Sequence, residues 1–164
     1  MGVDRTQQRA GGRAFLTKTI AVIPAGGAGT RLWPRSRRST PKHTLTLGGR
    51  GRPLLRDTYE RLRPLADEIY VVTEARQRQL IESVLPEVDD DHLILEPVAR
   101  GTTNAYGLAA LTLIERRPEA VMLTLPADHV VRGGQKVKNA VSVAVRAAAE
   151  SESLVAIGLK PTFP

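Results

Sequence analysis

Glycine, arginine and lysine residues gather in one short stretch, PAGGAGTRLWPRSRRSTPK, which covers residues 24–42. A glycine has no Cβ, so its main chain can turn tightly and bring N–H groups close to a ligand. Successive N–H groups in such a turn form a concave site for anions. The stretch therefore favours the binding of a polyphosphate. The candidate contacts in it are Ala25, Gly26, Gly27, Gly29, Thr30, Arg31 and Lys42.

The two common phosphate-binding motifs do not describe this stretch. A P-loop ends in Gly-Lys followed by Ser or Thr, and the chain contains no Gly-Lys pair. The dinucleotide fingerprint needs a third glycine, and residues 27–32 have Leu32 in its place. Prolines at both ends and in the middle of the stretch predict an extended loop. The sequence therefore argues against a P-loop kinase and against a dinucleotide-binding enzyme.

A carboxylate follows the apolar residues 121–125 and the pair Pro126-Ala127, at position 128. Mg²⁺ in proteins is held by one or two carboxylates together with phosphate oxygens. Asp128 is therefore a candidate ligand for Mg²⁺ beside the polyphosphate. The alternative is that Asp128 only caps a turn. The neighbouring His129 is given no catalytic role, because a single histidine in a turn is more often structural.

A second carboxylate, Glu96, ends the apolar run of residues 93–95. Such a group could accept hydrogen bonds from N1–H and N2–H₂ of guanine, a pair of donors that adenine lacks. The alternative, to which we give equal weight, is that Glu96 is only a surface glutamate before a turn. The candidate nucleotide contacts that follow are Arg100, Gly101 and Thr102. Arg100 could contact phosphate or ribose. Thr102 or Thr103 could instead cap the next helix.

Positive charge is concentrated around the glycine-rich stretch. The chain of 164 residues carries a net charge of +7, and residues 31–63 hold ten Lys or Arg against two acidic residues. Such a field attracts polyanions. Single-stranded nucleic acid usually also needs aromatic platforms, and Trp33 is the only aromatic residue in 31–58. We therefore expect a nucleotide and not a nucleic acid as the partner.

Composition narrows the class of protein further. There is no cysteine, which excludes a disulfide framework, a thiolate metal site and a cysteine nucleophile. No apolar run reaches membrane-spanning length, and residues 1–16 lack the apolar core of a secretory signal. We expect a cytoplasmic protein without a membrane partner. A flexible tail over residues 1–16 would precede one domain over residues 17–164, and the oligomeric state stays open, a homo-oligomer included.

Apolar runs alternate with helical patterns along the chain. The runs predict strands at 19–23, 69–72, 93–95, 121–125 and 154–159, and the spacing between them predicts helices at 53–63, 75–85, 103–117 and 135–150. This alternation is typical of an α/β fold with a doubly wound, mostly parallel sheet. Ligands of such sheets bind beyond the carboxyl ends of the strands, where the glycine-rich stretch, Glu96 and Asp128 all fall. Cations on phosphates beside a carboxylate for a metal favour phosphoryl or nucleotidyl transfer.

Residues 26–34, GGAGTRLWP, with Ser36-Arg37 and Pro41-Lys42 after them, resemble the signature of the sugar-phosphate nucleotidyltransferases. The Leu-Trp-Pro variant is most similar to the mannose-1-phosphate guanylyltransferases. Further matching segments follow in the same order along the chain: Glu96-Pro97, residues 108–110, residues 125–129 and residues 158–162. The resemblance covers residues 19–164 and implies a Rossmann-like nucleotidyltransferase fold.

The resemblance implies transfer of GMP from GTP to mannose 1-phosphate, giving GDP-mannose and pyrophosphate with Mg²⁺ as cofactor. By motif position, Arg31 and Lys42 would stabilise the phosphates and Asp128 would hold the metal. The family usually continues Pro-Lys with Gln-Phe, whereas this chain has His43-Thr44. The sugar-binding half of the family follows beyond the segment matched here, so we expect a nucleotide-binding half, apparently truncated.

Three alternatives stay open at this stage. One is a non-catalytic nucleotide-binding module that pairs with another subunit. Another is a related nucleotidyltransferase that uses a different sugar or base. The last is a nucleic-acid-binding protein that uses the basic segment, which would show strong, salt-sensitive binding to any oligonucleotide.

Overall fold

The structure is a computed structural model that describes residues 17–27, 29–47, 49–131, 134–151 and 153–158. The tail predicted over residues 1–16 lies outside the described residues. Within these ranges the strands are β1 (Thr19–Pro24), β2 (Glu68–Glu74), β3 (Leu93–Glu96) and β4 (Val121–Thr124), and the α-helices are α1 (Leu54–Leu62), α2 (Arg78–Val84), α3 (Thr102–Arg116) and α4 (Gln135–Ser151). Short 3-10 turns are η1 (Thr30–Leu32), η2 (Lys42–Thr44), η3 (Ala75–Gln77) and η4 (Asp90–His92). No helix in the described ranges is long and apolar enough to span a membrane.

The strands form one parallel sheet in the order β3-β2-β1-β4. β1 lies between β2 and β4, and Val22 is paired with Tyr70 on one side and with Thr124 on the other. A strand enclosed in this way is apolar on both faces, as residues 20–23 are. The predicted doubly wound, parallel α/β fold is confirmed, with each predicted helix and the first four predicted strands close to their expected bounds.

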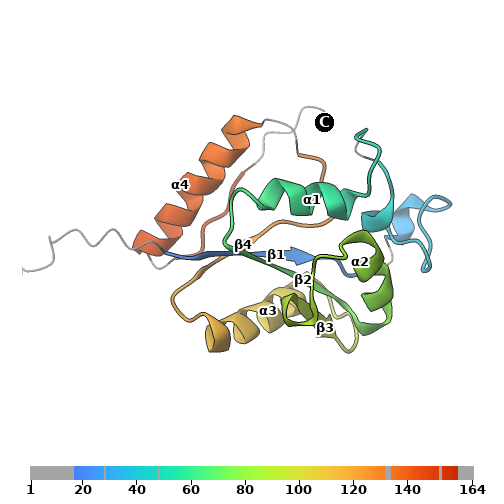
Figure 1. The fold of residues 1–164 in the computed structure, drawn as a ribbon, viewed down its shortest axis with the longest axis horizontal. Helices are drawn as coiled ribbons and strands as arrows, with labels where there is room; N and C mark the ends of the chain where they lie inside the picture. The colour runs from blue at the N-terminus through green and yellow to red at the C-terminus, as the bar shows by residue number, and fades with distance from the viewer. Residues whose placement is uncertain (1–16, 28, 48, 132–133, 152, 159–164) are drawn as a thin grey trace, which may run out of the picture.

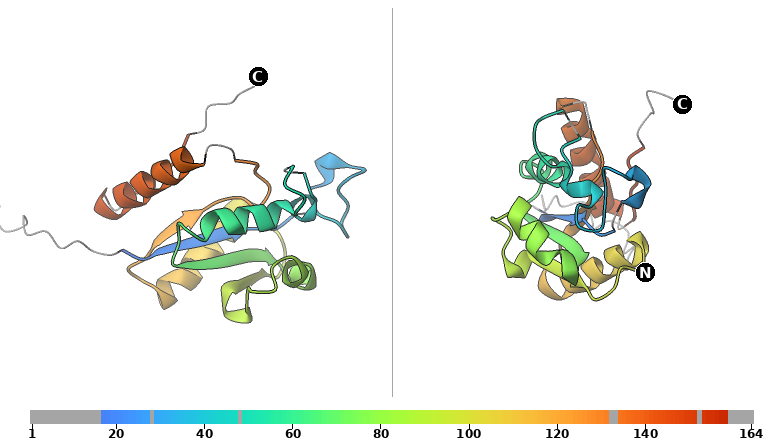
Figure 2. Two further views of the ribbon diagram at one scale, coloured as in Figure 1. Left: turned by 45° about the horizontal axis from the view of Figure 1, so that its top comes forward. Right: turned by 90° about the vertical axis from the view of Figure 1, so that its right-hand side faces the viewer.

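Helices cover both faces of the sheet. The alternate side chains Ala21 and Ile23 of β1 pack with α1, α2 and α4, whereas Ile20 and Val22 pack with α3. Figure 1 shows α1 and α4 on one side of the sheet and α3 on the other, and Figure 2 shows the same arrangement from two further sides. The two small cores are joined through β1, which contributes to both.

The direction of winding reverses next to β1. The chain proceeds from β1 through β2 to the edge strand β3, and α3 then carries it back across the opposite face to β4, beside β1. Loops that leave β1 and β4 at their carboxyl ends consequently diverge, and the opening between them is the usual ligand site of such sheets. This opening is where the glycine-rich stretch and Asp128 meet.

The strand predicted over residues 154–159 is wrong for the part that is described. Residues 153–158 have no regular secondary structure, and Leu154 is fully exposed. An apolar run becomes a strand only where it finds a hydrogen-bonding neighbour and a face to bury. This segment pairs with no described strand, and Leu159 lies outside the described residues.

Candidate functional site

A cavity of about 420 Å³ opens at the carboxyl ends of β1, β3 and β4. The segments that follow these three strands line it, together with η2 and the first turns of α3. Its walls carry charged groups at two places and otherwise consist of small or flat side chains. The lining residues are Pro24, Gly26, Gly27, Gly29, Lys42, His43, Glu96, Ala99, Gly101, Thr102, Ala105, Tyr106, Pro126, Ala127, Asp128 and His129.

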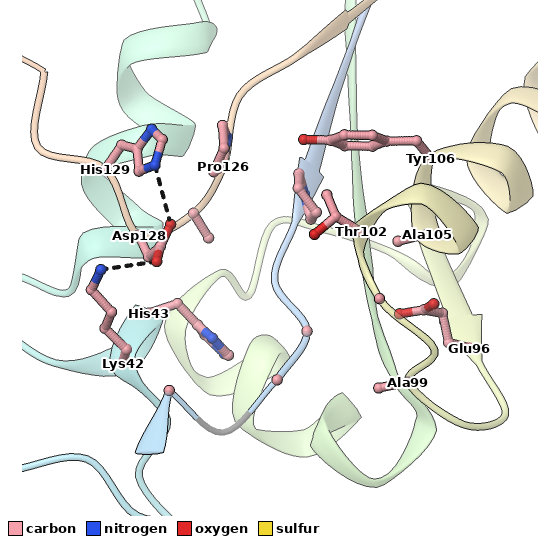
Figure 3. A pocket seen from close by; sticks show the side chains of 16 residues that line it. Lys42, His43, Glu96, Ala99, Thr102, Ala105, Tyr106, Pro126, Asp128 and His129 are labelled. Carbon is pink, nitrogen blue, oxygen red and sulfur yellow. Dashed lines mark hydrogen bonds and ion pairs between the residues drawn. The ribbon is translucent and has the colours of Figure 1, made fainter. Parts of the chain in front are cut away.

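Lys42 and Asp128 form an ion pair at one end of the cavity (Figure 3). Lys42 begins η2, and its Nζ donates to Asp128 Oδ2 over 2.9 Å. His129 Nε2 lies 3.8 Å from the other carboxylate oxygen. Burial raises the pKa of the Asp128 carboxyl, but the hydrogen bond and charge of Lys42 and the charge of His129 outweigh it and hold this pKa below its ordinary value. Asp128 is therefore a carboxylate that already has a cationic partner.

Gly29 allows Lys42 to approach the main chain of the glycine-rich stretch. It has a φ of +58°, and a Cβ added there would lie 2.5 Å from Lys42 Cβ, closer than real contacts allow. The Ser36 hydroxyl donates to the Gly29 carbonyl over 2.5 Å and holds this turn from the other side. A side chain at position 29 would have to displace Lys42, and with it the partner of Asp128.

The main-chain N–H groups of the glycine-rich stretch are not all available to a phosphate. Ala25 donates its N–H to the Val72 carbonyl over 2.7 Å. Among the described residues, no acceptor is hydrogen-bonded to the N–H of Gly26, Gly27 or Gly29. Within the part of the stretch that is described, the concave anion site predicted from sequence therefore keeps three main-chain donors.

Glu96 lies at the opposite end of the cavity, at the end of β3 (Figure 3). The residue is 6% exposed, and a Cβ added at Gly26 would lie 3.4 Å from its Oε2. Burial, and in second place the charge of Glu74, raise the pKa of the Glu96 carboxyl. Close to Glu96 in Figure 3 are the small residues Ala99 and Ala105, with Thr102 and the ring of Tyr106 on the same side of the cavity.

The structure brings some of the sequence-predicted site residues together and leaves others away from the cavity. Gly26, Gly27, Gly29, Lys42, Glu96, Gly101, Thr102 and Asp128 line it. Thr30 and Arg31 lie on η1 with exposed side chains, and Arg100 is exposed beside Gly101. Ala25 is buried in the core, with its N–H bonded to Val72 and its carbonyl accepting from the Thr73 hydroxyl.

Three residues at the site were not selected from the sequence as candidates. Tyr106 lines the cavity from α3, one turn after Thr102. Glu74 ends β2 outside the cavity, and its pKa is lowered chiefly by the hydrogen bond from Arg76 and in smaller part by the Gly27 N–H. His43 lines the cavity next to Lys42, and the only signal for it was its place in the motif, where the resembling family has glutamine.

His43 is a buried histidine on the cavity wall. It is 3% exposed, and its Nε2 has no hydrogen-bond partner among the described residues. Burial lowers its pKa to about 4, although the charge of Asp128 acts in the opposite direction. The imidazole is consequently neutral at physiological pH, and protonating it costs more in the folded chain than in the unfolded one.

We predict that His43 makes the free energy of unfolding depend on pH between about 4 and 6.5, its folded and unfolded pKa values. The unfolded chain binds the extra proton in this window, so stability increases as the pH rises through it, by about 3 kcal/mol in total. Urea unfolding at a series of pH values measures the slope. His43→Gln should flatten it, whereas the same change at the exposed His129 should leave it in place. An equal slope in wild type and His43→Gln would contradict this prediction.

The chain is similar in sequence to known nucleotidyl transferases. The family model described as nucleotidyl transferase matches residues 20–163. A mannose-1-phosphate guanylyltransferase of Salmonella typhimurium is 38% identical over 148 residues, which cover 87% of this chain and 30% of that protein. A xanthan biosynthesis protein of Xanthomonas campestris is 38% identical over 152 residues, which cover 91% of this chain and 32% of that protein.

A solved structure shows the same fold. A crystal structure described as mannose-1-phosphate geranyltransferase from Thermus thermophilus is similar with a TM-score of 0.70 and 36% sequence identity, over 82% of this chain and 39% of that one. The chain spans about a third of the length of the curated relatives it matches. With the family model covering nearly all of its residues, this chain belongs to the nucleotidyl transferase family.

Proposed function

We propose that this chain forms the nucleotide-binding part of a mannose-1-phosphate guanylyltransferase, which transfers GMP from GTP to mannose 1-phosphate. One observation carries the proposal. Lys42 and Asp128, 86 positions apart in sequence, form a charged pair at one end of a cavity whose other end holds Glu96. The cavity volume of about 420 Å³ is in the range of small-molecule sites. The names of the relatives support the choice of sugar and base.

The Lys42 end of the cavity suits the phosphates. In the proposed reaction an oxygen of mannose 1-phosphate attacks the α-phosphorus of GTP in line, and the bond to pyrophosphate breaks. Lys42 would bind the phosphate oxygens and neutralise the charge that develops on them, and the N–H groups of Gly26 and Gly29 would donate to the same oxygens. Thr30 and Arg31, which follow Gly29 on η1, remain proposed phosphate contacts on the exposed side.

Asp128 is the residue that would hold Mg²⁺. The described residues contain no group of three or more His, Cys, Asp or Glu side chains placed to hold a metal. A single carboxylate fits an ion that takes its other ligands from phosphate oxygens and water, as Mg²⁺ does in nucleotide sites. When bound, Mg²⁺ would neutralise charge on the phosphates and fix their orientation. Lys42, released from Asp128, would then be free to bind phosphate.

The Glu96 end suits the base. An ionised Glu96 can accept hydrogen bonds from N1–H and N2–H₂ of guanine. These hydrogen bonds would offset the unfavourable free energy of a buried carboxylate. Adenine has no such pair of donors and leaves the carboxylate unsatisfied. The flat ring of Tyr106 and the small Ala99 and Ala105 leave room for a planar base beside it. Arg100, Gly101 and Thr102 are proposed contacts to the ribose or phosphates.

The rest of the reaction is proposed from the resemblance alone. Because the chain spans about a third of its relatives, we assign it nucleotide binding and expect slow or absent GDP-mannose formation from it alone. The sugar phosphate would bind outside the segment that is matched here. We propose the cytoplasm as the location, since GTP is available there as a substrate.

We predict that the chain binds GTP with Mg²⁺ more tightly than ATP with Mg²⁺. Asp128→Asn should abolish the gain in GTP affinity that Mg²⁺ provides, because the amide offers a much weaker metal ligand. Trp33, the single tryptophan, is 74% exposed one residue after η1 and reports binding by its fluorescence. The matched control is Asp91→Asn in η4, at the opposite edge of the sheet. GTP affinity that responds to Mg²⁺ equally in wild type and Asp128→Asn would overturn the metal assignment.

We predict that Glu96→Gln removes the preference for guanine. Loss of hydrogen bonds to a charged group should weaken GTP binding about tenfold to a hundredfold, with ATP as the internal control. Calorimetric titration with GTP, ATP, CTP and UTP measures both affinity and preference. If Glu96→Gln binds GTP as wild type does, Glu96 does not contact the base. Tighter binding of a triphosphate other than GTP by wild type would instead indicate a related nucleotidyltransferase with another base.

A further inference from the structure

Glu74, the last residue of β2, is a buried carboxylate that does not line the cavity. Two side chains bind it: Arg76 Nε lies 2.6 Å from Oε2, and Gln77 Nε2 donates to Oε1 over 3.3 Å. Both come from η3, directly after the strand. Glu74 is thus held at the end of β2 by residues that follow it in the chain.

Glu74 and Glu96 are register partners on neighbouring strands. Both carboxylates lie on the side of the sheet that α3 covers, since Tyr70, Val72 and Ile94, at alternate positions before them, all pack in the core with α3. Both residues are 6% exposed. Their partners differ: Glu74 has two side-chain donors, whereas no donor among the described residues is bonded to Glu96. The carboxylate outside the cavity is therefore satisfied, and the one that lines the cavity is not.

We propose that Glu74 is a positioning residue of the nucleotide site. Held by Arg76 and Gln77, it places a negative charge beside Glu96, so that Glu96 gains most from a ligand that donates hydrogen bonds to it. The role in nucleotide binding rests on the proposed function, because it assumes that Glu96 meets the base. The effect of one carboxylate on the other does not depend on the identity of the ligand.

Among the charged groups of the described residues, Glu74 is the one whose charge shifts the pKa of Glu96. Arg76 binds Glu74 and points the guanidinium at that carboxylate. From α3 come the uncharged Thr102 and the Tyr106 side chain. Lys42 and Asp128 at the far end of the cavity are paired with each other, and His43 is neutral through burial. Burial and then the Glu74 charge raise the pKa of Glu96, so a ligand that donates to Glu96 relieves an unfavourable state.

The charge effect is tested without any nucleotide. The ¹³C signals of the glutamate carboxyl groups are followed by NMR across a pH titration, and Glu96→Gln identifies the signal of Glu96. In Glu74→Gln the midpoint of Glu96 should move down towards the ordinary value, because the neighbouring charge is gone. The control is Glu82→Gln, which removes an exposed carboxylate paired with Arg78 on α2. A folded Glu74→Gln with the wild-type midpoint would overturn the charge effect.

Nucleotide binding then separates this proposal from the proposed function. Glu74→Gln should extend tight GTP binding to lower pH and leave ATP binding unchanged, whereas Glu82→Gln should change neither. GTP binding with the same pH dependence in wild type and Glu74→Gln would overturn the role in nucleotide binding. If wild type binds no nucleotide, the proposed function fails, while the titration still decides whether Glu74 acts on Glu96.

Discussion

The parallel hydrogen-bond ladder around β1 continues past the ends of the strands, and the candidate site depends on this continuation. Ala25 donates to Val72 of β2 after β1 has ended, and Ala127 donates to the Pro24 carbonyl over 3.3 Å after β4 has ended. Loops are usually the least constrained parts of a fold. Here the first residues of two loops form hydrogen bonds that continue the ladder of the sheet, so strand pairing constrains the positions of the neighbouring Gly26 and Asp128.

The two ends of the cavity differ in how their charges are balanced. Asp128 is partly exposed and has Lys42 as its partner, so little free energy is stored there. Glu96 is buried without a donor and faces a second carboxylate, Glu74, in the next strand. A buried charge of this kind lowers stability unless it is satisfied. The unfavourable electrostatic interactions of the site are therefore concentrated at Glu96. Functional sites often contain such interactions at the expense of stability.

Local patterns in the sequence predicted most of the fold, because buried parallel strands and amphipathic helices leave clear periodic signals. The run 154–159 failed because a strand also needs a neighbour, which no local pattern reveals. Lys42, Glu96 and Asp128 could be predicted as site residues from their positions in the motif or at strand ends. The importance of Glu74 could not, since it depends on the register between β2 and β3, which places Glu74 beside Glu96. For His43, burial decides the protonation state, and burial becomes visible only in the folded chain.

The ion pair between Lys42 and Asp128 has a consequence for the order in which charges can enter the cavity. A lone cation that takes Asp128 leaves the ammonium group without a counterion, and a lone anion that takes Lys42 leaves the carboxylate in the same condition. Each of these exchanges gives up one favourable contact for another and gains little. A cation and an anion that arrive already joined would replace both partners at once, so that neither Lys42 nor Asp128 is left without an opposite charge. The pair would therefore favour a cation and an anion that bind together over either ion alone.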